Sequence, residues 1–467
     1  ICFSNKVILK IIKTTHNFCL INILIFCFSQ NQALTASKEP IISVLILKDK
    51  KIRIRSDRSI PLTIKGQRFS NKKIKGLTLK KQNNRTTLIF DKNKQKIYDL
   101  KNKEKFLVSS SDRRGIWVGQ KRYAGKLNIF ISDNHILVVN VLGIEKYLGS
   151  VVGSEMPAKW PLEALKAQAI ASRTYALKQK GNPLYDIDST NMNQVYIGLE
   201  AGTHKTKRAV NSTRSLVLTY ENKLINALFH SSSAGMTENS QDVWKNKYPY
   251  LSSVKDFDKN NPKLRWNQKF TKSQLQKLFP RIGGINKIEI LNVTSTGRVK
   301  NVRIHGDFGT DQISGVDLRK KMNLKSTLVR FKFVDDNEIK SLNDTPKLLS
   351  KNGLENEPLT HIVRVGDTLI VIADQYDVSV EEIVALNNIK YSSIIKIGQR
   401  LLVPRNPLNS SSSPAKILVV SGFGSGHGVG MSQWGAKHMA NQGAKAKTIL
   451  KHFYKGVEIK PFKKYFL

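Results

Sequence analysis

The sequence is poor in cysteine, poor in acidic side chains and free of long apolar runs. Its three cysteines, Cys2, Cys19 and Cys27, all lie near the start of the chain. The remaining sequence therefore offers neither a disulfide framework nor a cysteine metal site. The hydrophobic content is 40%, which is ordinary for a globular protein and too low for a polytopic membrane protein.

Several catalytic motifs are also missing. The sequence has no H-E-x-x-H zinc motif and no Walker loop. In the glycine-rich run 422–430 the glycines recur at every second residue, so the G-x-G-x-x-G fingerprint of dinucleotide-binding proteins is absent. Ser425 has Phe423 two residues before it, which excludes the G-x-S-x-G turn of α/β-hydrolases at this serine.

The shortage of acidic residues leaves a large positive charge. Lysine and arginine number 77 against 35 aspartates and glutamates, which gives a formal net charge of +42. This balance favours an anionic partner, such as nucleic acid, anionic lipid or a wall polymer that carries carboxylates. An AT-rich genome, which inflates lysine and asparagine codons, is the alternative explanation. Because the basic residues are dispersed, we expect no nucleic-acid partner.

The first 36 residues have the layout of a secretory signal. Three lysines precede an apolar core at 18–28, and small residues follow at 33–36. That core is shorter than the ~20 residues of a membrane-spanning helix, although an uncleaved anchor stays the alternative. Phe26 before Cys27 argues against lipidation. We therefore predict an exported protein, in the periplasm or cell wall, with no further membrane segment.

The rest of the chain is predicted to form a strand-rich, mixed α+β domain that a small module interrupts. Strand-forming segments dominate residues 41–147, and two of them, 127–131 and 135–141, flank a turn at Asp133-Asn134. A long helix is expected from Pro161, after a loop that contains Glu155. Further strands are expected at 215–220, 224–229, 287–293 and 299–304. Two polar, turn-rich stretches are interpreted as linkers, 335–360 and 405–416. The main domain then comprises two pieces, 41–334 and 417–463.

Residues 361–404, between these linkers, show the order β-α-α-β. Gly-Asp-Thr-Leu follows the first strand, and Gly-Gln-Arg-Leu opens the last one. The segment resembles a LysM module over its whole length. The resemblance implies binding to N-acetylglucosamine-containing glycans such as peptidoglycan; the alternative is a small packing domain without sugar binding. The implied sugar contacts are Gly366, Asp367, Thr368, Ile394 and Ile397.

Three long motifs lie outside this module. The first starts with Glu-Lys-Tyr-Leu at 145–148, passes through Gly-Ser-Glu155-Met-Pro and continues into Lys-Ala-Gln-Ala and Ser-Arg-Thr-Tyr-Ala. The second consists of 194–198, His230–Thr237, 243–244 and 248–251. The third is Gly424–Ala436. Together they closely resemble the stage II sporulation protein D family, also called the SpoIID/LytB domain. The resemblance covers 41–333 and 417–460. It implies a lytic transglycosylase that acts on glycan strands, in founding members on strands stripped of stem peptides, with Glu155 as the catalytic acid.

The chemistry suits a single carboxyl group. Breaking a glycosidic bond needs a proton for the leaving oxygen, and hydrolases usually add a second carboxylate. A lytic transglycosylase instead uses the 6-hydroxyl of the muramic acid, so that one carboxyl acts first as acid and then as base. Met156, Pro157 and Trp160 surround Glu155 in the sequence. Burial among such groups would raise its pKa towards neutrality, as a general acid requires.

Other residues of the motifs are candidates for substrate binding. Lys166 and Arg173 lie seven residues apart, hence on one helix face, where surface charge is the alternative role. In some relatives a histidine and nearby cysteines hold a metal at the position of His230; serines replace those cysteines here, so we predict no metal and no cofactor. The full set of candidate substrate contacts is Lys166, Arg173, Gln194, Tyr196, His230, Tyr250, Ser425, His427 and Gln433.

Two other functions stay open. Some relatives are described as enhancers of wall amidases, so a non-catalytic partner of a cell-wall amidase is the main alternative. The second alternative is a wall-binding protein in which both domains bind glycan without cleaving it. The intact motif around Glu155 favours the enzyme, whose partner is the peptidoglycan glycan strand.

Overall fold

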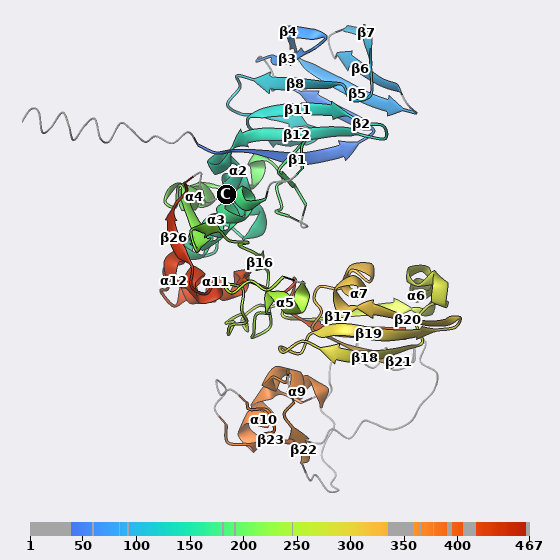
Figure 1. Cartoon of the computed structure of the whole chain (residues 1–467), viewed down its shortest axis with the longest axis vertical. Coiled ribbons are helices and arrows are strands. Elements are labelled where there is room, and N and C mark those ends of the chain that lie inside the picture. Colours follow the sequence, from blue (N-terminus) through green and yellow to red (C-terminus); the bar gives the residue numbers. More distant parts are fainter. Residues whose placement is uncertain are drawn as a thin grey trace, which may run out of the picture. The chain divides into compact units, whose positions relative to one another are not determined.

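The computed structural model describes residues 39–463, except 58–59, 84, 91–92, 180–181, 191–192, 245, 335–357, 365, 377, 390–394 and 405–416. The expected secretory signal and most of the two expected linkers therefore lie outside the described residues. The described part is a mixed α+β structure rich in antiparallel strands, which confirms the predicted fold class (Figure 1).

Two sheets form the N-terminal part. The first has the order β13-β1-β12-β11-β8-β3-β4. Its strands are β1 (Ile41–Asp49), β3 (Leu62–Gly66), β4 (Phe69–Ile74), β8 (Lys105–Ser110), β11 (Lys126–Ile131), β12 (Ile136–Gly143) and β13 (Ile187–Asp188). The second has the order β10-β9-β2-β5-β6-β7. Its strands are β2 (Lys51–Arg55), β5 (Gly76–Gln82), β6 (Arg85–Phe90), β7 (Asn93–Leu100), β9 (Ile116–Val118) and β10 (Lys121–Tyr123).

Alternating side chains of the two sheets share one core. Ile52 and Ile54 on β2 and Leu127 and Ile129 on β11 are buried in the same cluster, whereas their neighbours along each strand are more exposed. This period of two is the pattern that a half-buried strand requires. The predicted hairpin around Asp133 is confirmed, since β11 and β12 pair in antiparallel register.

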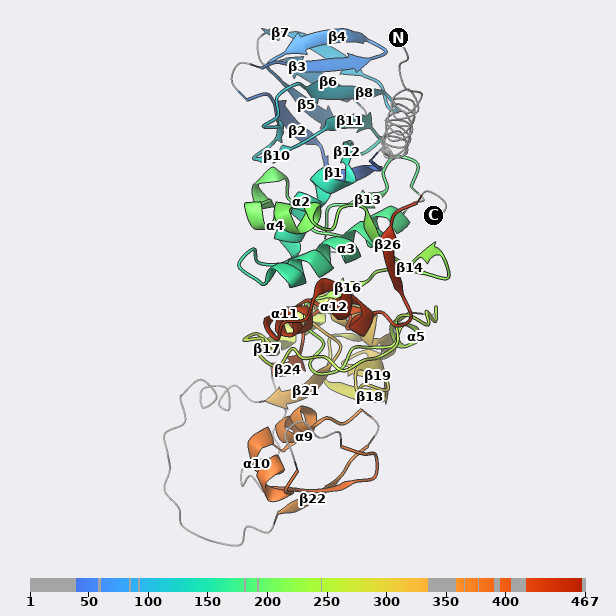
Figure 2. The ribbon, with the colours of Figure 1, turned by 90° about the vertical axis from the view of Figure 1, so that its left-hand side faces the viewer.

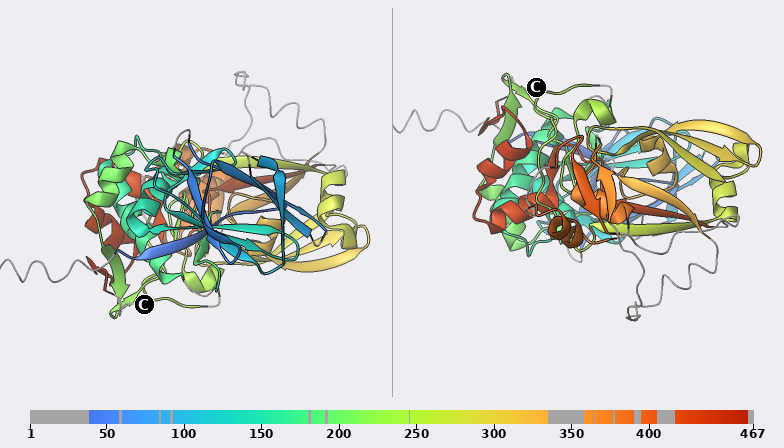
Figure 3. Two further views of the ribbon diagram at one scale, coloured as in Figure 1. Left: turned by 90° about the horizontal axis from the view of Figure 1, so that it is seen from above. Right: turned by 90° about the horizontal axis from the view of Figure 1, so that it is seen from below.

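A helical layer follows the sheets. It consists of α2 (Ile144–Glu155), α3 (Leu162–Lys178), α4 (His204–Asn211), α11 (Gln433–Asn441) and α12 (Ala446–Phe453). The predicted long helix is α3, and small residues such as Ala164, Ala167 and Ala171 let other helices approach it closely. Its neighbours include α11 and α12 from the C-terminal end of the chain, drawn in red (Figures 2 and 3).

Helix α2 was not expected, and it corrects the predicted loop at Glu155. The residue ends this helix, and the loop begins only at Met156. Gly149 and Gly153 lower the helix propensity of the segment, which hides the helix in the sequence. Packing explains the glycine at position 153, because a Cβ atom there would lie 1.9 Å from the carbonyl oxygen of Ala201. Glycine thus permits the close approach of α2 to the 3₁₀ helix η1 (Leu199–Ala201).

The C-terminal piece completes sheets that earlier residues begin. Strand β24 (Ile417–Phe423) pairs with both β17 (Arg265–Thr271) and β21 (Val329–Val334). Strand β26 (Glu458–Pro461) pairs with β14 (Leu216–Tyr220), which also pairs with β15 (Lys223–Leu224). Strand β25 (Met431–Ser432) runs parallel to β16 (Phe229–His230). The expected strand 224–229 is thus only two short strands.

A second core lies around β17, β21 and β24. The adjoining sheet has the order β18-β19-β20. Its strands are β18 (Lys287–Val293), β19 (Val299–Gly306) and β20 (Gly309–Ser314), and the nearby helices are α5 (Ser240–Val243), α6 (Lys272–Leu278), η2 (Pro280–Ile282) and α7 (Gly315–Lys321). Trp266, Phe270 and Leu418 belong to this core, which the inserted module does not share.

The inserted module has the predicted β-α-α-β order. It comprises β22 (Leu359–Ile362), α9 (Leu369–Gln375), α10 (Val380–Leu386) and β23 (Arg400–Val403), and β22 pairs with β23. Ile372, Ile383 and Leu401 are fully buried in a core of its own. In the described part of the chain we find no helix long and apolar enough to cross a membrane.

Candidate functional site

Glu155 is held by two segments that are distant in sequence. One carboxylate oxygen accepts a hydrogen bond from the Val195 backbone N–H at 2.8 Å, and the other accepts one from Nε2 of Gln433 at 3.2 Å. Gln433 opens α11 and belongs to the third motif. The fold thus brings the three sequence motifs together at one carboxyl group.

The pKa of Glu155 is raised above its ordinary value. Burial is the main cause, because it removes water from the charged form, while the hydrogen bonds from Val195 and Gln433 act in the opposite direction. No second carboxylate within the described residues contributes to this shift. The arrangement can therefore supply a proton at a pH where an exposed glutamate is ionised.

Two tryptophans that follow Glu155 and Gln433 in the sequence pack against each other. The rings of Trp160 and Trp434 meet edge to face, with centroids 4.9 Å apart. The Lys437 ammonium lies 4.2 Å from the centroid of the Trp434 ring and 5.3 Å from that of Trp160. The sequence reasoning missed Trp434 and Lys437; their spacing from Gln433 on one helix was the available signal.

Lys166 and Arg173 face different surroundings although both lie on α3. Lys166 is partly exposed and pairs with Glu163 at 2.7 Å. Arg173 is 1% exposed and pairs with Glu145 at 2.6 Å. Its guanidinium also donates to the Leu216 carbonyl. The structure therefore places Arg173 in the interior, as a link between α3, α2 and the segment before β14, rather than towards a substrate.

Gln194 and Tyr196 also point into the interior. Gln194 accepts a hydrogen bond from the Tyr147 hydroxyl at 2.9 Å and donates to the Ser172 carbonyl. The Tyr196 hydroxyl donates to Asn140 at 2.8 Å. These two side chains flank Val195, whose N–H binds Glu155. They position that N–H.

Tyr250 is a further buried candidate. Its hydroxyl accepts a hydrogen bond from the Asn226 N–H at 3.1 Å, and its ring stacks on Tyr248 with centroids 5.5 Å apart. Only 7% of Tyr250 is exposed. Its predicted role in binding substrate therefore has no support from its contacts, which are those of a packing residue.

The histidine pair lies in the glycine-rich loop and beside it. The ring centroids of His230 and His427 are 5.6 Å apart, and the half-exposed ring of Trp244 lies 5.2 Å from that of His427. Burial, together with the nearby cations Arg319 and Arg298, lowers the pKa of His427 to about 3. His427 is therefore neutral at physiological pH and offers a hydrogen bond rather than a charge.

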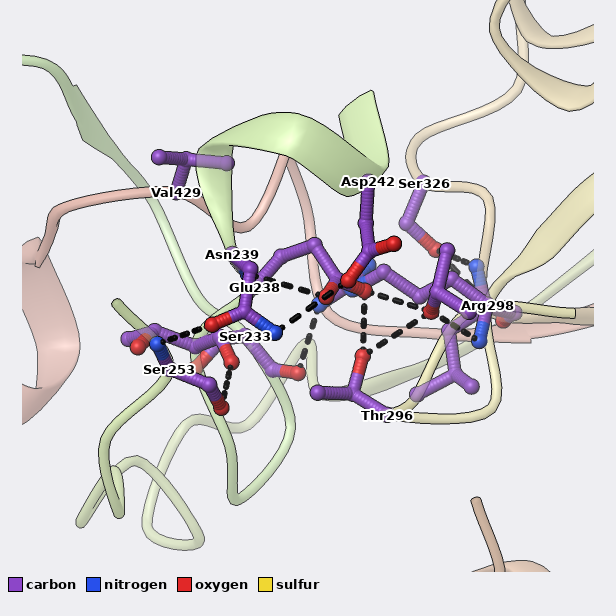
Figure 4. A network of polar contacts seen from close by, with 12 residues as sticks. Ser233, Glu238, Asn239, Asp242, Ser253, Thr296, Arg298, Ser326 and Val429 are labelled. Carbon is purple, nitrogen blue, oxygen red and sulfur yellow. Dashed lines mark hydrogen bonds and ion pairs between the residues drawn. The ribbon is translucent and has the colours of Figure 1, made fainter. Parts of the chain in front are cut away.

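A buried polar network lies against the glycine-rich loop that contains His427 (Figure 4). Arg298 donates to the Ser233 carbonyl at 2.8 Å and lies 3.8 Å from Glu238, which also accepts hydrogen bonds from Thr294 and Thr296. Gly428 lies directly on the guanidinium, since its φ is +84° and a Cβ there would lie 2.9 Å from Arg298 atoms. Only glycine satisfies both conditions.

The loop and Glu155 are connected through the strand pair β16–β25. His230 lies opposite Ser432, the residue before Gln433. Ser425 exchanges backbone hydrogen bonds with Ser232 at 2.8 and 3.0 Å, which fixes the start of the loop. His230, Ser425, His427 and Gln433 therefore belong to one local structure, and Gln433 is the member that touches Glu155. No group of three potential metal ligands occurs among the residues that the structure describes.

In the inserted module, three of the predicted sugar contacts, Gly366, Asp367 and Thr368, form the turn before α9. Asp367 accepts hydrogen bonds from the Arg364 N–H at 2.7 Å and pairs with His361 at 2.8 Å. Thr368 accepts one from the Val371 N–H at 3.2 Å, and Gly366 has a φ of +92°. Ile397 is 70% exposed. Ile394 lies outside the described residues.

Comparisons with known proteins match both parts of the chain. A family model described as Stage II sporulation protein (SpoIID) matches residues 132–220, and the LysM domain model matches residues 361–404. The chain is 29% identical to Stage II sporulation protein D of Bacillus amyloliquefaciens over 355 residues, which cover 71% of this chain and 77% of that protein. It is 30% identical to a protein of Bacillus subtilis named Amidase enhancer over 314 residues, which cover 67% of this chain and 40% of that protein.

Proposed function

We infer the function from the two domains that this chain contains, a SpoIID domain and a LysM domain, which together indicate a cell-wall-related protein. We propose that it is a lytic transglycosylase that cleaves peptidoglycan glycan strands and leaves 1,6-anhydromuramoyl ends. The observation that supports this most is the partly buried carboxyl of Glu155, whose pKa is raised and which contacts Gln433. A wall-associated, exported location is part of the same proposal.

The proposed reaction has two proton transfers through one carboxyl. The protonated Glu155 gives its proton to the oxygen of the glycosidic bond, and the bond from that oxygen to C1 of the muramic acid breaks. The 6-hydroxyl of the same sugar then attacks C1, and its proton passes to the Glu155 carboxylate. The acid is regenerated, and no water molecule is consumed. A single carboxyl without a carboxylate neighbour is sufficient for this sequence.

Product analysis tests the proposal. Purified protein is incubated with peptide-free glycan strands, and the products are identified by mass spectrometry. We expect 1,6-anhydromuramoyl ends, and we expect Glu155→Gln to lower their rate of formation by roughly 100-fold or more, since general acid catalysis contributes ~10²–10⁴-fold.

The matched control for this experiment is Glu221→Gln. Glu221 is an exposed turn residue, so the same chemical change there should leave the rate unaltered. Equal rates for Glu155→Gln and the wild-type protein would refute the assignment of Glu155.

A second candidate function is stimulation of a cell-wall amidase. It is favoured by the similarity to the protein named Amidase enhancer. An amidase assay with and without this chain separates the two functions. If the chain is an enhancer, it accelerates the amidase, and its Glu155→Gln variant accelerates the amidase to the same extent.

A further inference from the structure

Helix α11, whose first residue contacts Glu155, carries a lysine that makes no ion pair within the described residues. Lys437 lies on α11, four residues after Gln433 and three after Trp434. Residues with these spacings lie on one helix face, with Cβ atoms roughly 5–6 Å apart. The side chain that touches Glu155 and the Lys437 ammonium are thus neighbours along one line of the helix.

Trp434 and Trp160 fix the position of this ammonium. The cation lies against both rings, at 4.2 and 5.3 Å from their centroids. A cation–π contact of this kind orients a lysine without using its N–H donors. The ammonium can therefore still donate hydrogen bonds to an anion. Trp434 is only partly buried, so it also offers an aromatic surface to a sugar ring.

The two basic residues of α3 that the sequence singled out are already paired. Lys166 pairs with Glu163, and Arg173 pairs with Glu145 in the interior. Lys437 does not contribute to the pKa shift of Glu155, so it is not a direct partner of the acid. It is a fixed positive charge about one helical turn away from the group that binds the acid.

The substrate class of the proposed reaction carries one matching anion. Each muramic acid bears a lactyl group, whose carboxyl is a free carboxylate in a peptide-free strand. In a strand with stem peptides the same carboxyl is part of an amide bond and has no charge.

We propose that Lys437, held on Trp434, is the residue that binds the free lactyl carboxylate of a muramoyl residue. The preference for peptide-free strands, which the family resemblance implies, would then depend on this one side chain. This inference rests on the proposed cleavage of glycan strands by Glu155. One charge-assisted hydrogen bond, from the Lys437 ammonium to the lactyl carboxylate, would then distinguish peptide-free strands from strands with stem peptides.

The test compares two soluble glycan oligomers of equal length, one with lactyl carboxylates and one with lactyl carboxamides. This pair changes the charge without adding a peptide. For the wild-type protein we expect kcat/KM to be higher on the carboxylate oligomer. Lys437→Met removes the charge and keeps an unbranched side chain. It should therefore lower kcat/KM on the carboxylate oligomer by about tenfold or more and leave kcat/KM on the carboxamide oligomer unchanged.

Two further variants complete the design. Lys437→Arg should retain the preference, because it retains the charge. Lys447→Met removes an exposed lysine on α12 and should behave as the wild-type protein does. Equal rates of the wild-type protein on the two oligomers would overturn the proposal, and so would an equal loss on both oligomers in Lys437→Met.

Binding measurements separate this inference from the proposed catalysis. The dissociation constants of both oligomers are measured for Glu155→Gln with and without Lys437→Met. The LysM module contributes equally to both proteins. A carboxylate preference that disappears with Lys437→Met supports the binding site even if no cleavage is ever detected. The absence of any such preference refutes the site even if cleavage occurs.

Discussion

At the scale of single residues, the central feature is the carboxyl group of Glu155, whose pKa is raised by burial. Glu155 was assigned from its motif, and the structure adds the contacts that the motif does not contain. The hydrogen bonds from Val195 and Gln433 stabilise the charged form and so oppose the effect of burial. The balance between these terms sets the pH range in which the acid can donate its proton.

Replacing Gln433 with leucine should shift this range. The variant loses a donor that stabilises the Glu155 carboxylate, so the pKa of Glu155 should rise further. Because the first step needs the protonated acid, the alkaline limb of the kcat/KM profile should move towards higher pH. Gln442→Leu, at the exposed end of the same helix, is the control. A shift towards lower pH would contradict the account.

The surroundings of individual side chains could not be predicted from the sequence. Spacing placed Lys166 and Arg173 on one face of a helix, but α3 is buried on most sides and spacing cannot say which neighbour each residue meets. Lys437, in contrast, was not predicted as a site residue. Its significance depends on the rings of Trp160 and Trp434, which come together only in the folded chain.

At the scale of elements, the buried ion pair between Arg173 and Glu145 links two helices of the site. Arg173→Met removes the buried cation that pairs with Glu145 and should lower the free energy of unfolding by about 3 kcal/mol or more. The double variant Glu145→Leu/Arg173→Met should recover much of that loss. Urea unfolding measures both.

The exposed pair of Arg281 with Asp311 provides the comparison. Arg281→Met should change the free energy of unfolding by less than about 1 kcal/mol. If Arg173→Met unfolds as easily as Arg281→Met but loses substrate affinity, Arg173 binds substrate as the family resemblance implies.

Elements with strong periodicity were predictable, and those that depend on packing were not. The hairpin β11–β12 and the helix α3 follow from alternation and from spacings of three and four. Helix α2 was not predicted because its two glycines disfavour a helix, and the close approach to Ala201 explains only Gly153. The consequence is local but important, since α2 is the element that presents Glu155.

At the scale of the whole molecule, the inserted module is joined between neighbouring strands. Val334 at the end of β21 lies opposite Ile417 at the start of β24. A chain that leaves β21 and returns at β24 therefore tolerates an insertion without a change in the sheet. The sequence located both pieces of the main domain by their motifs, but it did not reveal that their ends are paired.

Replacing residues 335–416 with an Asn-Gly turn should remove wall anchoring and leave the catalytic unit. We expect binding to insoluble peptidoglycan to fall by about tenfold or more, because one of two glycan-binding units is lost. Cleavage of short soluble strands should continue at a similar rate. A pull-down with insoluble peptidoglycan and a soluble-strand assay measure the two properties. Loss of cleavage on soluble strands would make the module part of the catalytic unit.

Cleavage of peptide-free strands in water labelled with heavy oxygen tests the central claim most directly. If one carboxyl passes a proton to the leaving oxygen and recovers it from the sugar's own 6-hydroxyl, the new ends are 1,6-anhydromuramoyl groups without the label. New reducing ends that carry the label would instead show a hydrolase, and an absence of new ends would leave Glu155 without a catalytic role.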